Sequence, residues 1–437
     1  MYRHPLLTRI NGSLECLAGL ADPRARRSVR WTPLAAALAA VLMALDPGCT
    51  LAVRCEDTLA CMAGDFTRRR RVGKTYNGLL KALERQAGTV LPLLKADLRK
   101  KVRKALGAVP KVAGWTLLAA DGSKDELPRT LDHEKTFGIA DNGVWPQAFV
   151  TAIVEVQTGL AWDWRLGVAR SNEREHLREM VPDLPDDALL LADGGFFGHP
   201  LWSLFDKHGK SFLIRVGGNV SLIRDLFPDA RIERQGDVVY AWPVNHQSTL
   251  APLRLRLIRV GSKKNPVYLL TNVLNPARLS VRAAGTIYRL RWGVELFYRT
   301  LKRTLGYAKL RSRSGRRGKL ELEWGLITAT ILALIGTHAL RRRRIHPGRQ
   351  SPAALVRALR AALLRGGTKP SETLAALDHA LARAVKDNYR RRKPKRSRHN
   401  PRTVNTPTPL RLKAPHLRRA TPRERRIARE SHSSLAA

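Results

Sequence analysis

The chain has 437 residues, enough for two or three domains, and its 79 Lys and Arg against 36 Asp and Glu give a formal net charge of +43. A surplus of this size repels itself in a compact particle unless a polyanion neutralises it. Nucleic acid is the first candidate for that partner, because each phosphate that is neutralised releases counterions and adds affinity. An anionic membrane surface and a ribosomal role stay open on charge alone.

The cysteines and the apolar stretches argue against a secreted scaffold and a membrane protein. No Cys-x-x-Cys pair or zinc-ligand spacing occurs among the four cysteines, so we expect reduced thiols. From the residues at the start of the sequence we expect no secretory signal. The apolar stretch 34–45 is short, and 324–340 contains threonines and a histidine, so both are expected to be buried helices. We therefore expect a cytoplasmic, nucleoid-associated protein of a prokaryote that has no membrane partner.

Residues 1–110 have the pattern of a helical domain. Helices are expected at 34–45, 75–93 and 94–106, the first of them ended by Asp-Pro-Gly. The basic run 68–71 next to these small helices favours a surface that contacts phosphates. We interpret this region as a domain that binds a DNA end.

Residues 111–340 have the pattern of a catalytic α/β domain. Strands are expected at 115–120, 148–156, 160–166, 188–192 and 211–216, and helices at 172–180 and 201–207. This order suits a ribonuclease-H-like core, which is a mixed sheet flanked by helices. A β-rich insertion is expected at about 217–266, after which the core resumes with a strand at 267–272 and a long helix at about 280–305.

The remaining chain is expected to form a helical C-terminal region and a tail. The region 341–388 begins with an arginine run and should contain helices at 352–364 and 371–385. The tail 389–437 is basic and poor in apolar residues, a composition typical of disorder.

Two aspartates follow apolar strands and are candidates for metal ligands. Asp121 is expected at the end of strand 115–120 and Asp193 at the end of strand 188–192. Paired carboxylates on neighbouring strand ends can bridge divalent cations if a third acid faces them. Each aspartate alone is equally well explained by an ordinary turn after a strand. The other nearby acids are expected to be solvated in polar turns; they are Asp125, Glu126, Asp186 and Asp187.

The third acid is expected on the helix at 280–305. Four polar residues fall within an arc of roughly 60° on that helix; they are Tyr288, Arg291, Glu295 and Lys302. The apolar residues fall on a separate arc; they are Leu290, Val294, Phe297, Leu301 and Leu305. An ordinary surface helix with an Arg291–Glu295 pair explains two of the polar residues but not the tyrosine and the lysine on the same line.

These residues resemble a known family. The spacing Tyr-x2-Arg-x3-Glu-x6-Lys is similar to the signature of the DDE transposases of the insertion-sequence-four family. Asp121-Gly122-Ser123 and Asp193-Gly194-Gly195-Phe196 resemble its two aspartate motifs, and the resemblance covers about residues 110–340. One departure is Gly194, where many members have arginine.

The resemblance implies an enzyme that cleaves DNA at transposon ends and transfers the strands into target DNA. It implies that Asp121, Asp193 and Glu295 hold two Mg²⁺ ions, which Mn²⁺ can replace. Arg291 and Lys302 would then bind phosphates near the scissile bond, and Tyr288 would contact the same backbone. The implied partners are double-stranded DNA, both terminal inverted repeats and target, and a second copy of the chain in the DNA complex.

Trp242, in the expected insertion, has two interpretations. It is a candidate for stacking on a flipped DNA base, as relatives of this family use an aromatic residue. A lone tryptophan in a β-rich segment is more often part of a core.

Two alternatives to an active transposase stay open. One is a DNA-binding remnant that has lost catalysis, and the other is a ribonuclease-H-like nuclease that cuts without joining. The presence of all three acids favours the active enzyme over the remnant. The Tyr–Arg–Glu–Lys spacing is not expected in a simple nuclease.

Overall fold

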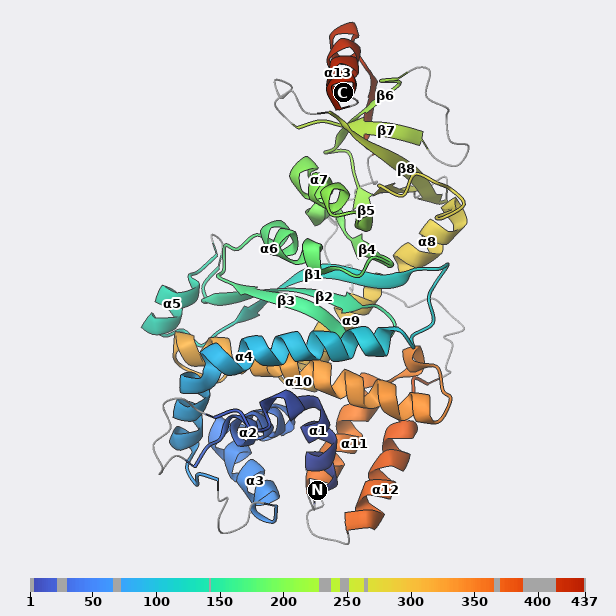
Figure 1. Cartoon of the computed structure of the whole chain (residues 1–437). Helices are drawn as coiled ribbons and strands as arrows, with labels where there is room; N and C mark the ends of the chain where they lie inside the picture. Colours follow the sequence, from blue (N-terminus) through green and yellow to red (C-terminus); the bar gives the residue numbers. More distant parts are fainter. Residues whose placement is uncertain are drawn as a thin grey trace, which may run out of the picture. The chain divides into compact units, whose positions relative to one another are not determined.

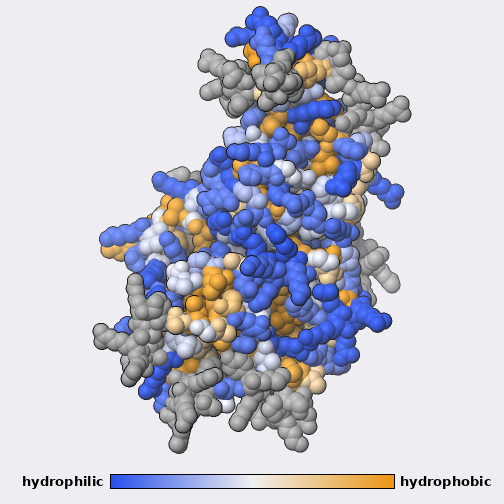
Figure 2. Space-filling model, viewed as in Figure 1, coloured by the Kyte–Doolittle hydropathy of each residue, from blue (hydrophilic) through white to orange (hydrophobic). Residues whose placement is uncertain are grey.

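The computed structural model (Figure 1) describes residues 4–21, 30–65, 72–140, 143–227, 237–243, 251–262, 266–364, 370–387 and 414–435. The chain divides into two compact units. The first unit comprises Met1–Val112, Thr116–Met180 and Leu290–Val385, and the second comprises Ala113–Trp115, Val181–Arg289 and Lys386–Ala437. This division cuts across the predicted boundaries, because the N-terminal helices share a unit with the strands expected at 115–120, 148–156 and 160–166. The face drawn in Figure 2 is mostly hydrophilic, in keeping with the excess of Lys and Arg.

The first unit contains most of the helices. They are α1 (Pro5–Leu14), α2 (Pro33–Leu45), α3 (Leu51–Ala63), α4 (Tyr76–Leu106), α5 (Leu131–Phe137), α6 (Glu173–Met180), α9 (Trp292–Arg299), α10 (Gly315–Arg342), α11 (Pro352–Leu364) and α12 (Pro370–Ala382), with short 3-10 turns at Glu15–Leu17 and Pro347–Arg349. The prediction of a helical region at 1–110 is confirmed for the part of it that the structure describes. The basic run 68–71 lies outside the described residues.

The N-terminal helices follow local signals with one exception. The α2 helix starts where the Thr32 side chain accepts a hydrogen bond from the Ala35 amide, and it ends at Asp46, as predicted. The two helices expected at 75–93 and 94–106 are wrong, because α4 runs unbroken through Pro92. A proline inside a helix removes a hydrogen bond, but α4 keeps one buried apolar stripe on both sides of it, including Val90 and Leu94.

The apolar stretch 324–340 lies in α10, which is a buried core helix as predicted. By length and composition α10 could cross a membrane, but 89% of its most apolar window is buried inside the protein. It packs against α2 and α4, and Figure 1 shows α4 and α10 running side by side.

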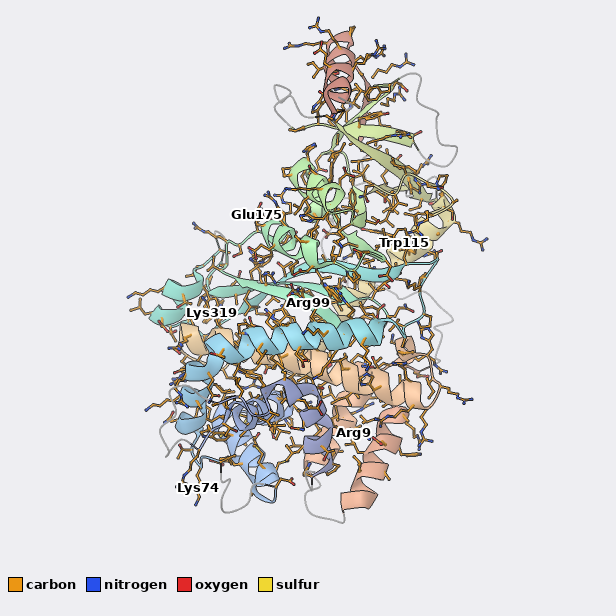
Figure 3. All side chains as sticks on the ribbon, viewed as in Figure 1. Arg9, Lys74, Arg99, Trp115, Glu175 and Lys319 are labelled. Carbon is orange, nitrogen blue, oxygen red and sulfur yellow. The ribbon has the colours of Figure 1, made fainter. Side chains whose placement is uncertain are left out.

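Three antiparallel strands complete the first unit. Its strands are β1 (Thr116–Glu126), β2 (Gln147–Glu155) and β3 (Ala161–Gly167), with β2 in the middle. Trp164 on β3 donates from Nε1 to Glu323 of α10 at 2.8 Å, and the Lys95 ammonium of α4 lies 4.6 Å from its ring centre. Arg99, labelled in Figure 3, extends from α4 toward this sheet and pairs with Asp163 at 2.6 Å. These contacts place α4 and α10 on one face of the sheet.

The second unit contains seven strands, which follow the order β10-β6-β7-β8-β9-β5-β4 in the sheet. The strands are β4 (Ala188–Ala192), β5 (Ser211–Val216), β6 (Ser221–Arg224), β7 (Asp237–Ala241), β8 (Leu253–Gly261), β9 (Pro266–Thr271) and β10 (His416–Arg419). The pairs β4–β5 and β6–β10 are parallel and the others are antiparallel. Helices α7 (His199–Lys207) and α8 (Val281–Arg289) pack on this sheet, and 3-10 turns lie at Val181–Asp183 and Gly194–Phe196.

Part of the basic tail is folded, so the predicted disorder is wrong for residues 416–435. Strand β10 pairs with β6, and α13 (Pro422–Leu435) follows it. Ala420 and Ala428 are buried in a cluster with Ile223 and Tyr240, and Trp242 packs partly buried against the same cluster. A few small apolar residues among the arginines are enough to dock the helix, which average composition does not reveal. The core interpretation of Trp242 is the one that its packing favours.

The single helix expected at 280–305 is also wrong. Helix α8 ends at Arg289 in the second unit, and α9 begins at Trp292 in the first. A π-helical turn follows α9 directly, at Thr300–Thr304. The signature residues therefore do not lie on one regular helix, and the predicted arc does not hold. Val294, Phe297, Leu301 and Leu305 are buried as expected, whereas Leu290 is 36% exposed.

Candidate active site

The six predicted site residues are divided between the two units. Asp121, Arg291, Glu295 and Lys302 belong to the first unit, and Asp193 and Tyr288 belong to the second. Among the described residues, no three or more His, Cys, Asp or Glu side chains form a group that could hold a metal ion.

Asp121 lies in the middle of β1 and not at its end, where it was predicted. The strand continues to Glu126, and Asp121 is opposite Ala152 of β2. The polar residues after Asp121 do not end the strand, because β2 pairs with β1 along this whole length. The Asp121 carboxylate accepts a hydrogen bond from the Gly122 amide at 2.9 Å. The orientation of the Asp121 side chain is therefore set by this hydrogen bond and by the face of β1 on which the residue lies.

The opposite face of β1 is covered by α6. Side chains alternate between the faces of a strand, so Gly122 and its neighbour Thr151 face away from Asp121. The Thr151 hydroxyl is hydrogen-bonded to Nδ1 of His176 on α6, at 2.8 Å. A Cβ at Gly122 would lie 2.5 Å from a carboxylate oxygen of Glu173, so this acid of α6 packs directly on the Asp-Gly-Ser segment. Sequence reasoning did not single out Glu173.

Glu295 lies on α9 and is held by Arg291. The Arg291 Nη2 donates to Glu295 Oε1 at 2.8 Å, the i, i+4 pair that the spacing predicted. The glutamate side chain is 32% exposed, whereas that of the arginine is 14% exposed. Trp292, between them in sequence, is 62% exposed, an indole in solvent that the sequence reasoning also missed.

Helix α9 is attached to the sheet by two close contacts. Gly293 packs on the backbone of Val156, and a Cβ there would lie 2.2 Å from the Val156 carbonyl oxygen. The buried Tyr298 hydroxyl donates toward two carbonyl oxygens, that of Asp121 at 2.8 Å and that of Val150 at 3.0 Å. Burial, and then the nearby Asp121 carboxylate, raise the pKa of Tyr298 well above its usual value, so the hydroxyl stays protonated as a donor.

Lys302 and Asp125 form an ion pair beneath the π-helical turn. The Lys302 ammonium is 2.9 Å from Asp125 Oδ1 and donates to the Lys124 carbonyl at 2.5 Å. The expectation that Asp125 is solvated is wrong, because it is on β1 and only 1% exposed. Burial raises the pKa of Asp125, and Lys302 opposes that shift. Of the other three acids expected to be solvated in polar turns, Asp186 is exposed and Asp187 is partly buried. Glu126 is exposed, but it is the last residue of β1 and does not lie in a turn.

In the second unit, Asp193 directly follows β4, as predicted. Its Oδ1 accepts a hydrogen bond from the Gly195 amide at 2.8 Å and caps the 3-10 turn Gly194–Phe196. A Cβ at Gly194 would have ordinary contact with its nearest neighbour, the Arg215 carbonyl oxygen at 3.7 Å. There is therefore room for a side chain at position 194, where many members of the family have arginine. Tyr288 lies partly buried in the last turn of α8.

Comparison with known proteins gives a matching family and a similar curated protein. Residues 115–331 match the family model described as "Transposase DDE domain". The transposase InsG for insertion sequence element IS4 of Escherichia coli (strain K12) is 27% identical over 232 residues, which cover 50% of this chain and 52% of InsG. The chain thus matches about half the length of that relative.

A solved structure with a similar chain is the piggyBac transposase in a synaptic complex with hairpin DNA. Its TM-score is 0.43 at 11% identity, covering 88% of this chain and 83% of that one.

Proposed function

We propose that this chain, which belongs to the DDE transposases of the insertion-sequence-four type, cleaves DNA at the ends of a mobile element and joins the freed strands to target DNA. The observation that carries the proposal is the match of residues 115–331 to the transposase domain, because this segment holds all six predicted site residues. The net charge of +43 supports DNA as the partner.

Asp121, Asp193 and Glu295 are the proposed metal ligands. All three are carboxylates, and hard oxygen donors of this kind suit Mg²⁺ and also Mn²⁺. Two such ions, when bound, would activate the attacking oxygen and stabilise the leaving oxygen of the phosphodiester. Asp121 and Glu295 are only partly buried, so their carboxylates are accessible to solvent.

The chain's own residues orient the acid and bind the substrate. Arg291 holds Glu295 in one rotamer through their 2.8 Å contact, which prepares the carboxylate before DNA arrives. Arg291, Lys302 and Tyr288 are proposed to contact the DNA backbone near the scissile phosphate. No side-chain nucleophile is required, because water and then the freed 3′-hydroxyl attack the phosphorus.

The core is proposed to be ribonuclease-H-like. In chain order, three antiparallel strands are followed by α6, β4, α7 and β5, with β4 and β5 parallel. This order supports the proposal, with α5 as an addition between β1 and β2. The strands β6 to β8 would form the insertion.

The partners and the location are proposals as well. We propose that the protein acts in the prokaryotic cytoplasm on its own terminal inverted repeats, as a homodimer on DNA. The helical region 1–110 is proposed to bind the DNA end.

The test is a strand-transfer assay with Mg²⁺ and a duplex that carries the repeats flanking the gene. The wild-type chain should cleave and join, whereas Asp121→Asn, Asp193→Asn and Glu295→Gln should each lose activity by more than about a thousandfold. Asp186→Asn is the matched control, because this carboxylate lies outside the proposed ligand set and is 97% exposed, beside Lys210.

The alternatives give different results in the same assay. Binding without cleavage by the wild-type chain would indicate an inactive remnant, and cleavage without joining would indicate a nuclease. Equal cleavage by Glu295→Gln and wild type would refute the assignment of the third ligand.

A further inference from the structure

We propose that Tyr298 and Asp125 are positioning residues, which fix α9 against β1 and so set the separation of the Asp121 and Glu295 carboxylates. The inference rests on the proposed function, because it takes those two carboxylates as metal ligands. Neither residue belongs to the signature or to the three acids. Both are buried, so neither is placed to contact DNA directly.

Tyr298 links the helix that carries Glu295 to the strand residue Asp121, because it lies on the same helix as Glu295 and its hydroxyl is hydrogen-bonded to the Asp121 backbone. It follows Glu295 by three residues on α9, so both lie within one turn of the helix. Its hydroxyl is 2.8 Å from the carbonyl oxygen of Asp121 itself. The acid on the helix and the acid on the strand are therefore joined through one phenol, and its second acceptor, Val150, extends the attachment to β2.

Asp125 makes the second attachment, further along the same strand. It is four residues after Asp121, so the two side chains lie on the same face of β1. Lys302, seven residues after Glu295, reaches Asp125 at 2.9 Å and the Lys124 carbonyl at 2.5 Å. A lysine ammonium has three donors, and these contacts use two, which leaves one for a DNA phosphate.

The backbone supports the same docking. Gly293 contacts Val156 without a side chain between them, and Glu126 at the end of β1 bridges to Lys309 beyond the π-helical turn. The turn itself, Thr300–Thr304, places Lys302 out of the regular helical register. Such π-turns are frequent at functional sites. Contacts before and after Glu295 thus hold one segment against β1 and the end of β2.

Two metal ions demand such rigidity, since ligands need to lie within about 0.5 Å of the productive geometry. Loss of an attachment should therefore change how the chain responds to metal more than how it binds DNA.

The experiment compares Tyr298→Phe and Asp125→Asn with two matched controls from the same unit. Tyr307→Phe removes a buried phenol hydroxyl. Asp163→Asn removes a buried acid that pairs with Arg99 of α4 and Arg165 of β3. Single-turnover end cleavage is measured over a range of Mg²⁺ concentrations, together with DNA affinity and thermal melting. Amide hydrogen exchange of residues 116–126 and 292–304 is measured without metal.

We expect Tyr298→Phe to raise the Mg²⁺ concentration for half-maximal cleavage by about three- to tenfold, which corresponds to one lost hydrogen bond. Exchange in the two segments should become faster by a similar factor, while DNA affinity stays within about twofold. Asp125→Asn should have a larger effect, since it leaves the Lys302 ammonium beside a neutral amide. The two controls should lower the melting temperature without changing the Mg²⁺ dependence.

The result that overturns the inference is a Tyr298→Phe chain with the Mg²⁺ dependence and segment exchange of Tyr307→Phe. If Asp125→Asn does not fold, Tyr298→Phe alone decides. Failure of the proposed function is distinct, because the wild-type chain would then not cleave DNA, or Asp121→Asn and Glu295→Gln would keep its cleavage rate.

Discussion

Replacing Gly293 by alanine is expected to displace α9 from the sheet and to slow DNA cleavage. A Cβ at this position would lie 2.2 Å from the carbonyl oxygen of Val156, 2.6 Å from its Cα and 2.7 Å from its carbonyl carbon. These are backbone atoms of a segment that leaves a paired strand, so they cannot rotate away. Because ordinary contact begins at 3.4 Å, the helix and the strand must separate by about 1.2 Å.

The displacement has two expected consequences of different size. Overpacking a buried contact costs about 1–3 kcal/mol of stability, offset by up to about 1 kcal/mol because alanine favours a helix over glycine. The catalytic effect is larger, because Glu295 is two residues away on the same helix. A misplacement of about 1 Å can reduce a reaction rate by about a hundredfold.

The assay is single-turnover cleavage of a pre-bound DNA end, with thermal melting measured in parallel. Gly88→Ala on α4 is the matched control, since it makes the same substitution in a helix where nothing lies within 4 Å of the new Cβ. The control should be as stable as the wild type or more so, and equally active. A Gly293→Ala chain that cleaves within about threefold of the wild-type rate would refute the reasoning.

Other predictions concern the tail, the thiols and the second aspartate motif. The hydrogen bond from Arg418 lowers the pKa of Glu424 from 4.5 to about 2. The ionised Glu424 therefore stabilises the docking of α13 above pH 4.5, and this stabilisation is lost as the pH falls through 2. Amide exchange in α13 should show that pH dependence in the wild type and not in Glu424→Gln. Burial raises the pKa of Cys61 to about 12, so iodoacetamide at pH 8 should label it at least about a hundredfold more slowly than exposed Cys49, as mass spectrometry of the folded chain can measure. Gly194→Arg should fit without loss of melting temperature and bind DNA about three- to tenfold tighter with a steeper salt dependence, whereas Gly194→Gln should change neither.

Features that depend on local sequence could be predicted well. The bounds of α2 follow from the Thr32 cap and the Asp-Pro-Gly stop, and the strand at 211–216 and the helix at 352–364 match the structure residue for residue. Asp193 directly after β4 and the Arg291–Glu295 pair were also predictable, because a buried strand ends at a turn and an i, i+4 pair needs one helical turn.

Features that depend on distant partners could not be predicted in this way. Asp125 lies in a polar stretch of sequence, which predicts a solvated residue. It is buried in the structure, where it pairs with Lys302, a residue far along the chain. For the same reason β1 extends through Asp121 and beyond, since pairing with β2 outweighs the low strand propensity of Asp-Gly-Ser. The break before Trp292 has no proline to mark it, and it coincides with the boundary between the two units.

The spacing of the signature residues reflects two requirements, contact with DNA and attachment of α9 to β1, and a helical wheel does not separate them. Lys302 at seven residues from Glu295 would share its face on a regular α-helix and so would point to DNA alone. The π-helical turn changes that register, and the ammonium instead reaches the buried carboxylate of Asp125. The spacing therefore constrains the attachment of α9 to β1 as well as contact with the substrate. If both constraints act, Lys302→Met should weaken DNA binding and also raise the Mg²⁺ requirement, whereas loss of Asp125 should change the Mg²⁺ requirement alone.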